Sequence, residues 1–211
     1  MTWIETFSGK RFDLMHPTPA MVDVADIAHA LARINRYTGH TATPYSVAEH
    51  ALHVCRRVMD LYPDREERAT LHALALHHDS GEYVIGDISA PMKWLLRQMC
   101  GQGQFPEERL HSDLDVIEDR VQATILTALG LPRPTSQQKA IIKAADLYML
   151  QVERWSLLPN TGQHPWGTNE GQPEGWQEHR INENGWRLAS TTEIEARFAR
   201  WSESLLAALP G

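Results

Sequence analysis

Residues Leu71–Asp87, with the sequence LHALALHHDSGEYVIGD, place polar groups where a buried helical face should continue. Asp79 directly follows His78, and Glu82 comes about one helical turn later. A buried histidine or carboxylate without a partner is costly in free energy, so this stretch predicts that another group satisfies them, most economically a divalent metal ion. The apolar series leading into the polar group has the three- and four-residue spacing of one helix face: Leu71, Leu74, Ala75 and His78.

Composition narrows the class of protein. The length of 211 residues fits one domain with a C-terminal elaboration. Cys55 and Cys100 give no disulfide framework, which favours a reduced, cytoplasmic setting. The N-terminal residues lack a signal-peptide pattern, and no run of 18 apolar residues predicts a membrane span. A net charge of −7 argues against binding a nucleic-acid duplex but permits a small phosphorylated ligand.

The apolar stripes and capping residues predict an all-α helical bundle, because neither strand alternation nor a βαβ pattern occurs. We expect residues 1–20 to be irregular and residues 159–190 to form a long ordered loop, since tryptophans stand at positions 155, 166, 176 and 186. Capping boxes are predicted at Ser46–Glu49, Thr135–Gln138 and Thr192–Glu195. The expected helices cover about residues 21–37, 46–61, 71–86, 88–99, 107–129, 135–158 and 192–209.

Two further polar residues belong to predicted apolar faces. His50 flanks the inward stripe of its helix, whereas His53 points away from it. Asp146 lies on an inward face, where an ion pair with an arginine is the alternative to a metal-ligating role. His40, His53, His72 and His111 are expected to be solvated, and His77 to be a surface or supporting residue. The stripe beside His50 is expected to contain Val47, Ala51, Val54, Val58 and Leu61.

The inward polar residues together are His50, His78, Asp79 and Asp146, which come from three helices. Two imidazoles and two carboxylates suit a catalytic transition metal such as zinc, cobalt or manganese, with room for water or a substrate oxygen. No cysteines stand nearby in the spacing of a closed structural zinc site, and no HExxH motif is present.

The order of these residues resembles the HD-domain phosphohydrolase superfamily. INRYTGH, YSVAEH, HHDSGEYVIGD and KAAD are similar to motifs of its 5′-deoxynucleotidase branch. The opening TWIETFSGKRFDLMHPTP most resembles relatives that include the phage dATP triphosphohydrolases. The resemblance covers about residues 1–158, the expected HD-type domain, and leaves 159–211 as a loop excursion with a C-terminal helix packed on the same domain.

The resemblance implies roles for residues around the expected metal. Glu82 corresponds to the residue that orients or activates the attacking water, and Asp87 to its partner in proton transfer or in sugar binding. Arg36 corresponds to the phosphate-binding arginine. The chemistry fits the residue types, because a metal neutralises phosphoryl oxygens and lowers the pKa of a bound water, and Glu82 can take the proton. Arg36 offers a planar fork for phosphate oxygens.

The resemblance also predicts dATP as the substrate, cut to deoxyadenosine and triphosphate. Lys93 is a point charge suited to a phosphate tail. Ile34, Tyr37 and Pro91 are expected to form the walls of an apolar base pocket. A second divalent ion bound with the substrate phosphates is compatible with this prediction.

Other functions stay open at this stage. The chain could be a 5′-deoxynucleotidase acting on deoxynucleoside monophosphates, or an HD protein that cleaves another phosphodiester such as a cyclic nucleotide. A catalytically silent nucleotide sensor is a third alternative, which the intact Glu82 and Asp87 disfavour. The relatives form dimers or larger rings, so the resemblance implies a homo-oligomer, either a dimer or a ring hexamer. It would work in the cytoplasm, or in the host cytoplasm if a phage encodes it.

Overall fold

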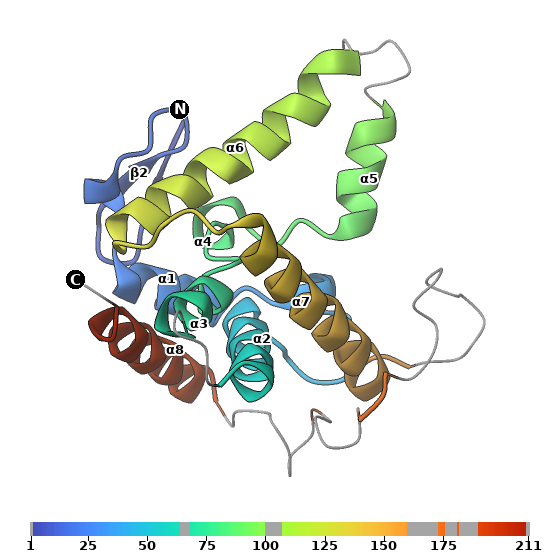
Figure 1. Cartoon of the computed structure of the whole chain (residues 1–211). Helices are drawn as coiled ribbons and strands as arrows, with labels where there is room; N and C mark the ends of the chain where they lie inside the picture. The colour runs from blue at the N-terminus through green and yellow to red at the C-terminus, as the bar shows by residue number, and fades with distance from the viewer. Residues whose placement is uncertain are drawn as a thin grey trace.

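The computed structural model is a helical bundle, which confirms the all-α prediction (Figure 1). It describes residues 2–63, 68–99, 107–159, 173–175, 181 and 190–209, without the side chains of residues 97–99 and 107–113. In this part of the chain, no helix is both long enough and apolar enough to cross a membrane. The helices are α1 (Val24–Leu31), α2 (Val47–Leu61), α3 (Arg68–Leu76), α4 (Glu82–Ile85), α5 (Ala90–Met99), α6 (Glu107–Ala128), α7 (Ser136–Leu157) and α8 (Thr191–Ala207).

Helix α2 lies at the centre of the bundle and packs against α3, α7 and α8 (Figure 1). Its apolar residues from Val47 to Val58 are almost completely buried, so they contribute directly to the hydrophobic core. The expectation that Leu61 is buried is wrong, since this side chain is 50% exposed. Leu61 ends the helix beside the exposed Asp60, where α2 reaches the surface.

The first residues are ordered as a hairpin, which corrects the expectation of an irregular segment. Strands β1 (Trp3–Glu5) and β2 (Arg11–Asp13) pair antiparallel, with Ile4 opposite Phe12. The buried carboxylate of Asp26 holds the hairpin loop by accepting hydrogen bonds from the Thr6 hydroxyl and from the amide and hydroxyl of Ser8, at 2.7–2.8 Å. Strands of three residues are too short to give a visible alternation of apolar and polar side chains.

The helix expected over residues 21–37 is interrupted. A 3₁₀ turn, η1 (Pro19–Met21), precedes α1, which already ends at Leu31. The chain then pairs antiparallel with the residues just before α2, at an isolated bridge between Asn35 and Ser46, and the Arg36 amide donates to the Tyr45 carbonyl at 2.9 Å. A second 3₁₀ turn, η2 (Arg36–Gly39), follows, and it therefore presents Arg36 from a turn and not from a helix.

The stretch Leu71–Asp87 forms two helices and not one. Helix α3 ends at Leu76, residues 77–81 form a turn, and α4 begins at Glu82. The turn is closed by its own backbone, since the Ser80 amide donates to the His77 carbonyl at 3.2 Å. His78 and Asp79 therefore project from a turn that joins two helices.

The predicted helix caps have different outcomes. The Thr135–Gln138 capping box is confirmed, with both reciprocal hydrogen bonds formed. At Ser46 the serine half of the motif is present, because its hydroxyl accepts from the Glu49 amide at 3.2 Å. The box expected at Thr192–Glu195 is wrong, since Ser190 caps α8 by accepting from the Glu193 amide.

Some expectations fall outside the described residues. These are the solvation of His111, and Trp166, Trp176 and Trp186 of the predicted ordered loop. On α5, the side chain of Trp94 is 61% exposed.

Candidate metal centre and active site

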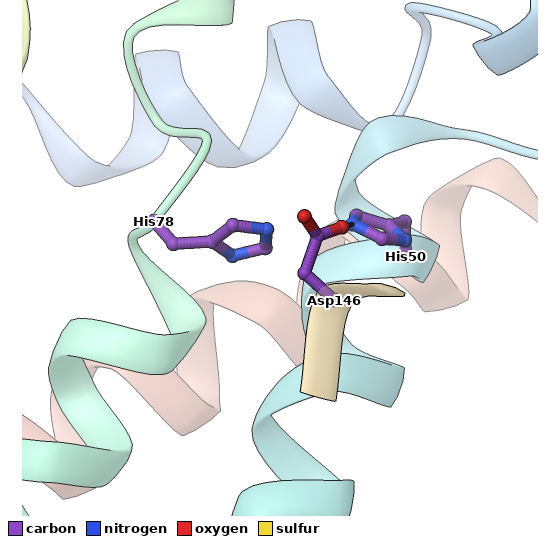
Figure 2. A group of neighbouring side chains, drawn as sticks. All are labelled: His50, His78 and Asp146. Atoms are coloured by element: carbon purple, nitrogen blue, oxygen red, sulfur yellow. Dashed lines mark ion pairs between the residues drawn. The ribbon is translucent and has the colours of Figure 1, made fainter. Parts of the chain in front are cut away.

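Three of the four predicted ligands converge in space from three separate elements. His50 comes from α2, His78 from the turn after α3, and Asp146 from α7 (Figure 2). Their potential ligand atoms all lie within 4.8 Å of one another. Asp146 lies between the two imidazole rings, with its Oδ1 atom 3.2 Å from His50 Nε2.

Asp79, the fourth predicted ligand, reaches the same place. Its Oδ2 atom lies 3.1 Å from His78 Nε2 and 3.7 Å from His50 Nε2. The fold therefore brings together all four polar residues singled out from the sequence. That they bind a metal ion stays a prediction. The protonation and hydrogen bonding of these side chains show whether they are suited to it.

The two histidines are oriented as neutral metal ligands would be. His50 Nδ1 contacts Glu153 Oε1 at 2.5 Å, and His78 Nδ1 contacts the Ala75 carbonyl at 2.8 Å. A carboxylate and a carbonyl only accept, so each Nδ1 carries a proton, and Nε2 is the atom that can offer its lone pair to a metal ion. In the described part of the chain, both buried Nε2 atoms lack a hydrogen-bond partner, although carboxylates lie close. These residues fit a divalent cation.

The charges around this cluster also suit a cation. Burial opposes ionisation of Asp79 and Asp146, but neighbouring His78 and His50 hold the pKa of each carboxyl well below its usual range. Burial also opposes a charge on His78, yet Asp79 raises the pKa of His78 to about 9. A divalent ion between the two carboxylates would replace these imidazole protons as their counter-charge.

Glu82 stands beside the cluster as the first residue of α4. Burial, followed by the nearby carboxylates of Asp79 and Asp87, raises the pKa of Glu82 to about 9. Its Oε2 atom is buried and makes no hydrogen bond within the described residues. Burial likewise raises the pKa of Asp87. Two carboxyl groups with elevated proton affinity next to a cation site are typical of proton-transfer residues.

Arg36 reaches the cluster from the η2 turn. Its Nε atom donates to Glu153 Oε2 at 3.2 Å, and its Nη1 atom lies 3.9 Å from Asp79 Oδ2. The Tyr37 hydroxyl donates to Glu153 Oε2 at 2.6 Å. The predicted phosphate-binding arginine is therefore held beside the predicted metal ligands.

Lys93 lies in an acidic cavity of about 330 Å³ that also contains Glu82 and Asp79. Its ammonium group already pairs with Glu118 at 2.8 Å. The remaining charged groups lining this cavity are His78, Asp115 and Asp119.

Two of the three residues expected to line the base pocket, Ile34 and Pro91, lie outside the two cavities described beside His78 and Asp79. Pro91 is exposed at the start of α5, and Ile34 packs against the core. Neither lines the cavity that contains Lys93 or a second cavity of about 450 Å³ that also has His78 and Asp79 in its lining. The base-binding role of these residues stays a prediction.

Sequence reasoning missed Glu153, which is completely buried and bonds both His50 and Arg36. Burial opposes its ionisation, but Arg36 and His50 lower the pKa of Glu153 to about 2. A signal was present, because Glu153 follows Asp146 by seven residues, or two helical turns, and so shares its face of α7.

A second group of missed residues fixes the turn that carries His78 and Asp79. Gln122 of α6 donates to the His77 carbonyl at 2.6 Å and accepts from the Gly81 amide at 3.1 Å. The His77 ring, expected at the surface or in support, is completely buried between the hydroxyls of Ser80 and Ser202, each 2.9 Å away. These contacts give His77 a supporting role.

His53 and His72 were expected to be solvated, and both are buried. The Tyr45 hydroxyl lies 2.8 Å from His53 Nδ1, so this imidazole is hydrogen-bonded to a tyrosine two residues before α2 begins. For His53 the expectation failed because α2 is covered by other elements on more than one side, so a position away from the main stripe is also enclosed.

Comparison with known proteins identifies the class. The model of the YfbR-like 5′-deoxynucleotidase family matches residues 27–154, more than half of the chain and the segment that contains the four predicted metal ligands, Arg36, Glu82 and Glu153. The chain belongs to this family. It is an HD-domain phosphohydrolase, and the resemblance seen in its sequence motifs is confirmed at this level.

Individual relatives share much of the chain. It is 38% identical to an uncharacterized protein of Rhodobacter capsulatus over 72% of its own length and 70% of the relative. It is 34% identical to the uncharacterized protein YfdR of Escherichia coli over 82% of each. The 5′-deoxynucleotidase PM0747 of Pasteurella multocida is 26% identical over 67% of this chain and 62% of that protein.

Proposed function

We propose that this YfbR-like protein hydrolyses 2′-deoxynucleoside 5′-monophosphates to a deoxynucleoside and inorganic phosphate with the help of a divalent metal ion. The observation that carries the proposal is the convergence of His50, His78, Asp79 and Asp146 beside Arg36 and Glu82. The name of the Pasteurella relative and the family description support the substrate class.

The residues divide the work of the reaction. The metal, when bound, neutralises charge on the phosphoryl oxygens and makes water a better nucleophile. Arg36 binds phosphate oxygens with the guanidinium donors that Glu153 leaves free. Glu82 accepts a proton from the attacking water as the water oxygen bonds to phosphorus and the bond between phosphorus and the 5′ oxygen breaks. The 5′ oxygen takes up a proton and leaves as the hydroxyl of the deoxynucleoside. Asp87, whose pKa is also raised, is the nearby group that shares this proton or binds the sugar.

The surroundings of Lys93 favour a monophosphate over the triphosphate predicted from resemblance. A triphosphate tail needs additional free cations, but Lys93 is paired with Glu118 in a cavity lined by several carboxylates. The dATP triphosphohydrolase function, with a second divalent ion bound to the phosphate tail, is therefore the second candidate. We keep this candidate because Lys93 lines the same cavity as Glu82 and Asp79, where it could meet a phosphate tail.

One panel of substrates separates the candidates. The protein is loaded in turn with cobalt, manganese, zinc or magnesium and offered dAMP, dGMP, AMP, dATP, dGTP and a cyclic nucleotide. We expect inorganic phosphate from deoxynucleoside monophosphates and little turnover of AMP. Triphosphate release from dATP, with no reaction on dAMP, would replace the proposal by the second candidate. No turnover of any compound, with a nucleotide still bound, would indicate a silent sensor.

Replacing Arg36 by lysine should raise KM for the monophosphate by about 10–100-fold, because charge-assisted hydrogen bonds to phosphate are lost. Steady-state kinetics measure the effect. Arg33→Lys is the matched control, since Arg33 lies three residues earlier but pairs with Glu195 at the surface. Equal KM values for both variants would remove Arg36 from phosphate binding.

A homo-oligomer remains a proposal that the family resemblance suggests. The exposed apolar side chains Met92, Trp94 and Leu95 on α5 are compatible with it. Light scattering of the full chain decides between a monomer, a dimer and a hexameric ring.

A further inference from the structure

Glu153 is a single buried carboxylate that accepts from four different side chains. Oε1 faces His50 Nδ1 at 2.5 Å and the Tyr45 hydroxyl at 3.1 Å. Oε2 faces Arg36 Nε at 3.2 Å and the Tyr37 hydroxyl at 2.6 Å. Because every partner donates, this arrangement requires the ionised carboxylate, which only accepts.

The contacts of Glu153 Oε1 determine which nitrogen of His50 faces the predicted metal site. A proton held on Nδ1 by Glu153 leaves Nε2 as the lone-pair atom directed at Asp79 and Asp146. Hydrogen bonds of this kind fix the ring orientation and raise the basicity of a ligating histidine. Glu153 thus orients the His50 imidazole for metal binding without itself being one of the converging ligands.

The contacts of Oε2 hold the turn that presents Arg36. Tyr37 and Thr38 adopt left-handed backbone conformations, with φ values of 55° and 50°. Such conformations are unfavourable for residues other than glycine and persist only where the surroundings enforce them. The hydrogen bonds from Arg36 and Tyr37 to Oε2 anchor this turn to α7.

We propose that Glu153 is a positioning residue that couples the two halves of the site, orienting His50 for the metal through one oxygen and Arg36 for the substrate phosphate through the other. The inference rests on the proposed function, since its metal half needs the divalent ion and its phosphate half needs the substrate. It goes beyond the metal and substrate residues themselves, because Glu153 acts through them.

Glu153→Gln tests the coupling. The amide keeps the shape of the carboxylate, but its NH₂ group faces the two donors that one carboxylate oxygen now accepts from. We expect the affinity of the metal-free protein for cobalt, measured by calorimetry, to fall by roughly 10–100-fold. We expect KM for the monophosphate to rise in the same variant, and the affinity of manganese-loaded protein for inorganic phosphate to fall. Glu195→Gln is the matched control, since Glu195 also bonds an arginine and a histidine, Arg33 and His29, away from the site.

Two tyrosine variants separate the oxygens and keep the test decisive if Glu153→Gln does not fold. Tyr45→Phe, which removes a donor to Oε1, should weaken cobalt binding and leave phosphate affinity unchanged. Tyr37→Phe, which removes a donor to Oε2, should weaken phosphate binding and leave cobalt affinity unchanged.

Several outcomes overturn the coupling. One is a lower unfolding temperature of Glu153→Gln with unchanged cobalt and phosphate affinities, which would make Glu153 structural only. Another is the same profile for both tyrosine variants. If the unaltered protein turns over no monophosphate, the proposed function fails, while the cobalt and phosphate titrations still decide the role of Glu153.

Discussion

Replacing Glu82 by glutamine is expected to lower kcat by about 10²–10⁴-fold, the usual contribution of a general base. The metal content of the variant should match that of the unaltered protein. The reason is position, because Glu82 begins α4 and lines the cavity beside Asp79, but it is not among the three residues whose ligand atoms converge.

The carboxyl group of Glu82 is suited to this task by its surroundings. Burial and two neighbouring carboxylates raise its pKa to about 9, so it binds a proton more readily than an exposed glutamate. A cation at the adjacent cluster would favour the ionised form, which is the form that accepts a proton from water. Glutamine keeps the size of the side chain but cannot accept that proton.

Asp115→Asn is the matched control, since Asp115 lines the same cavity and has no assigned role in the reaction. Its kcat should stay near that of the unaltered protein. Metal content is measured by elemental analysis and kcat with saturating monophosphate. A Glu82→Gln variant that loses its metal, or that keeps full activity, would contradict the general-base assignment.

Replacing Asp146 by asparagine should abolish both metal retention and turnover. Asp146 lies between His50 and His78, and its removal leaves two imidazoles facing each other without the carboxylate from α7. The loss of negative charge also lowers the attraction for a cation. The purified variant is expected to contain substoichiometric metal and to show no detectable phosphate release.

Thermal unfolding gives a second readout that does not depend on activity. A metal at about 100 times its Kd adds about 2.7 kcal/mol to the stability of a protein that binds it only when folded. Cobalt should therefore raise the unfolding temperature of the unaltered protein but not that of Asp146→Asn. Asp60→Asn, a surface change on α2, is the control. An equal cobalt-induced shift in Asp146→Asn would remove Asp146 from the metal site.

The positions of the predicted metal residues could be anticipated because each breaks an apolar pattern. His50, His78 and Asp146 occur where helical spacing requires core residues, and burial of a polar group needs a reason. The structure brings these three together with Asp79. The spacing alone could not show that α3 stops at Leu76, since a turn closed by backbone hydrogen bonds leaves no periodic signal.

Glu153 and Gln122 escaped prediction for a different reason. Their partners are far away in sequence, at His50 and at the turn between His77 and Gly81. A buried carboxylate surrounded by donors looks like a surface glutamate until the tertiary structure supplies those donors. The Tyr37 turn was missed because two successive left-handed residues other than glycine are rare, and they depend on Glu153.

The hydrogen bond between His77 and Ser202 determines how late in protein synthesis the site can be completed. The two residues are 125 positions apart, and His77 directly precedes His78. A nascent chain that has emerged through α7 already holds all four clustered polar residues, yet it lacks the hydroxyl that fixes the His77 ring. Because synthesis proceeds from the N-terminus, the turn bearing His78 and Asp79 reaches its final hydrogen bonding only when α8 has been made and has docked.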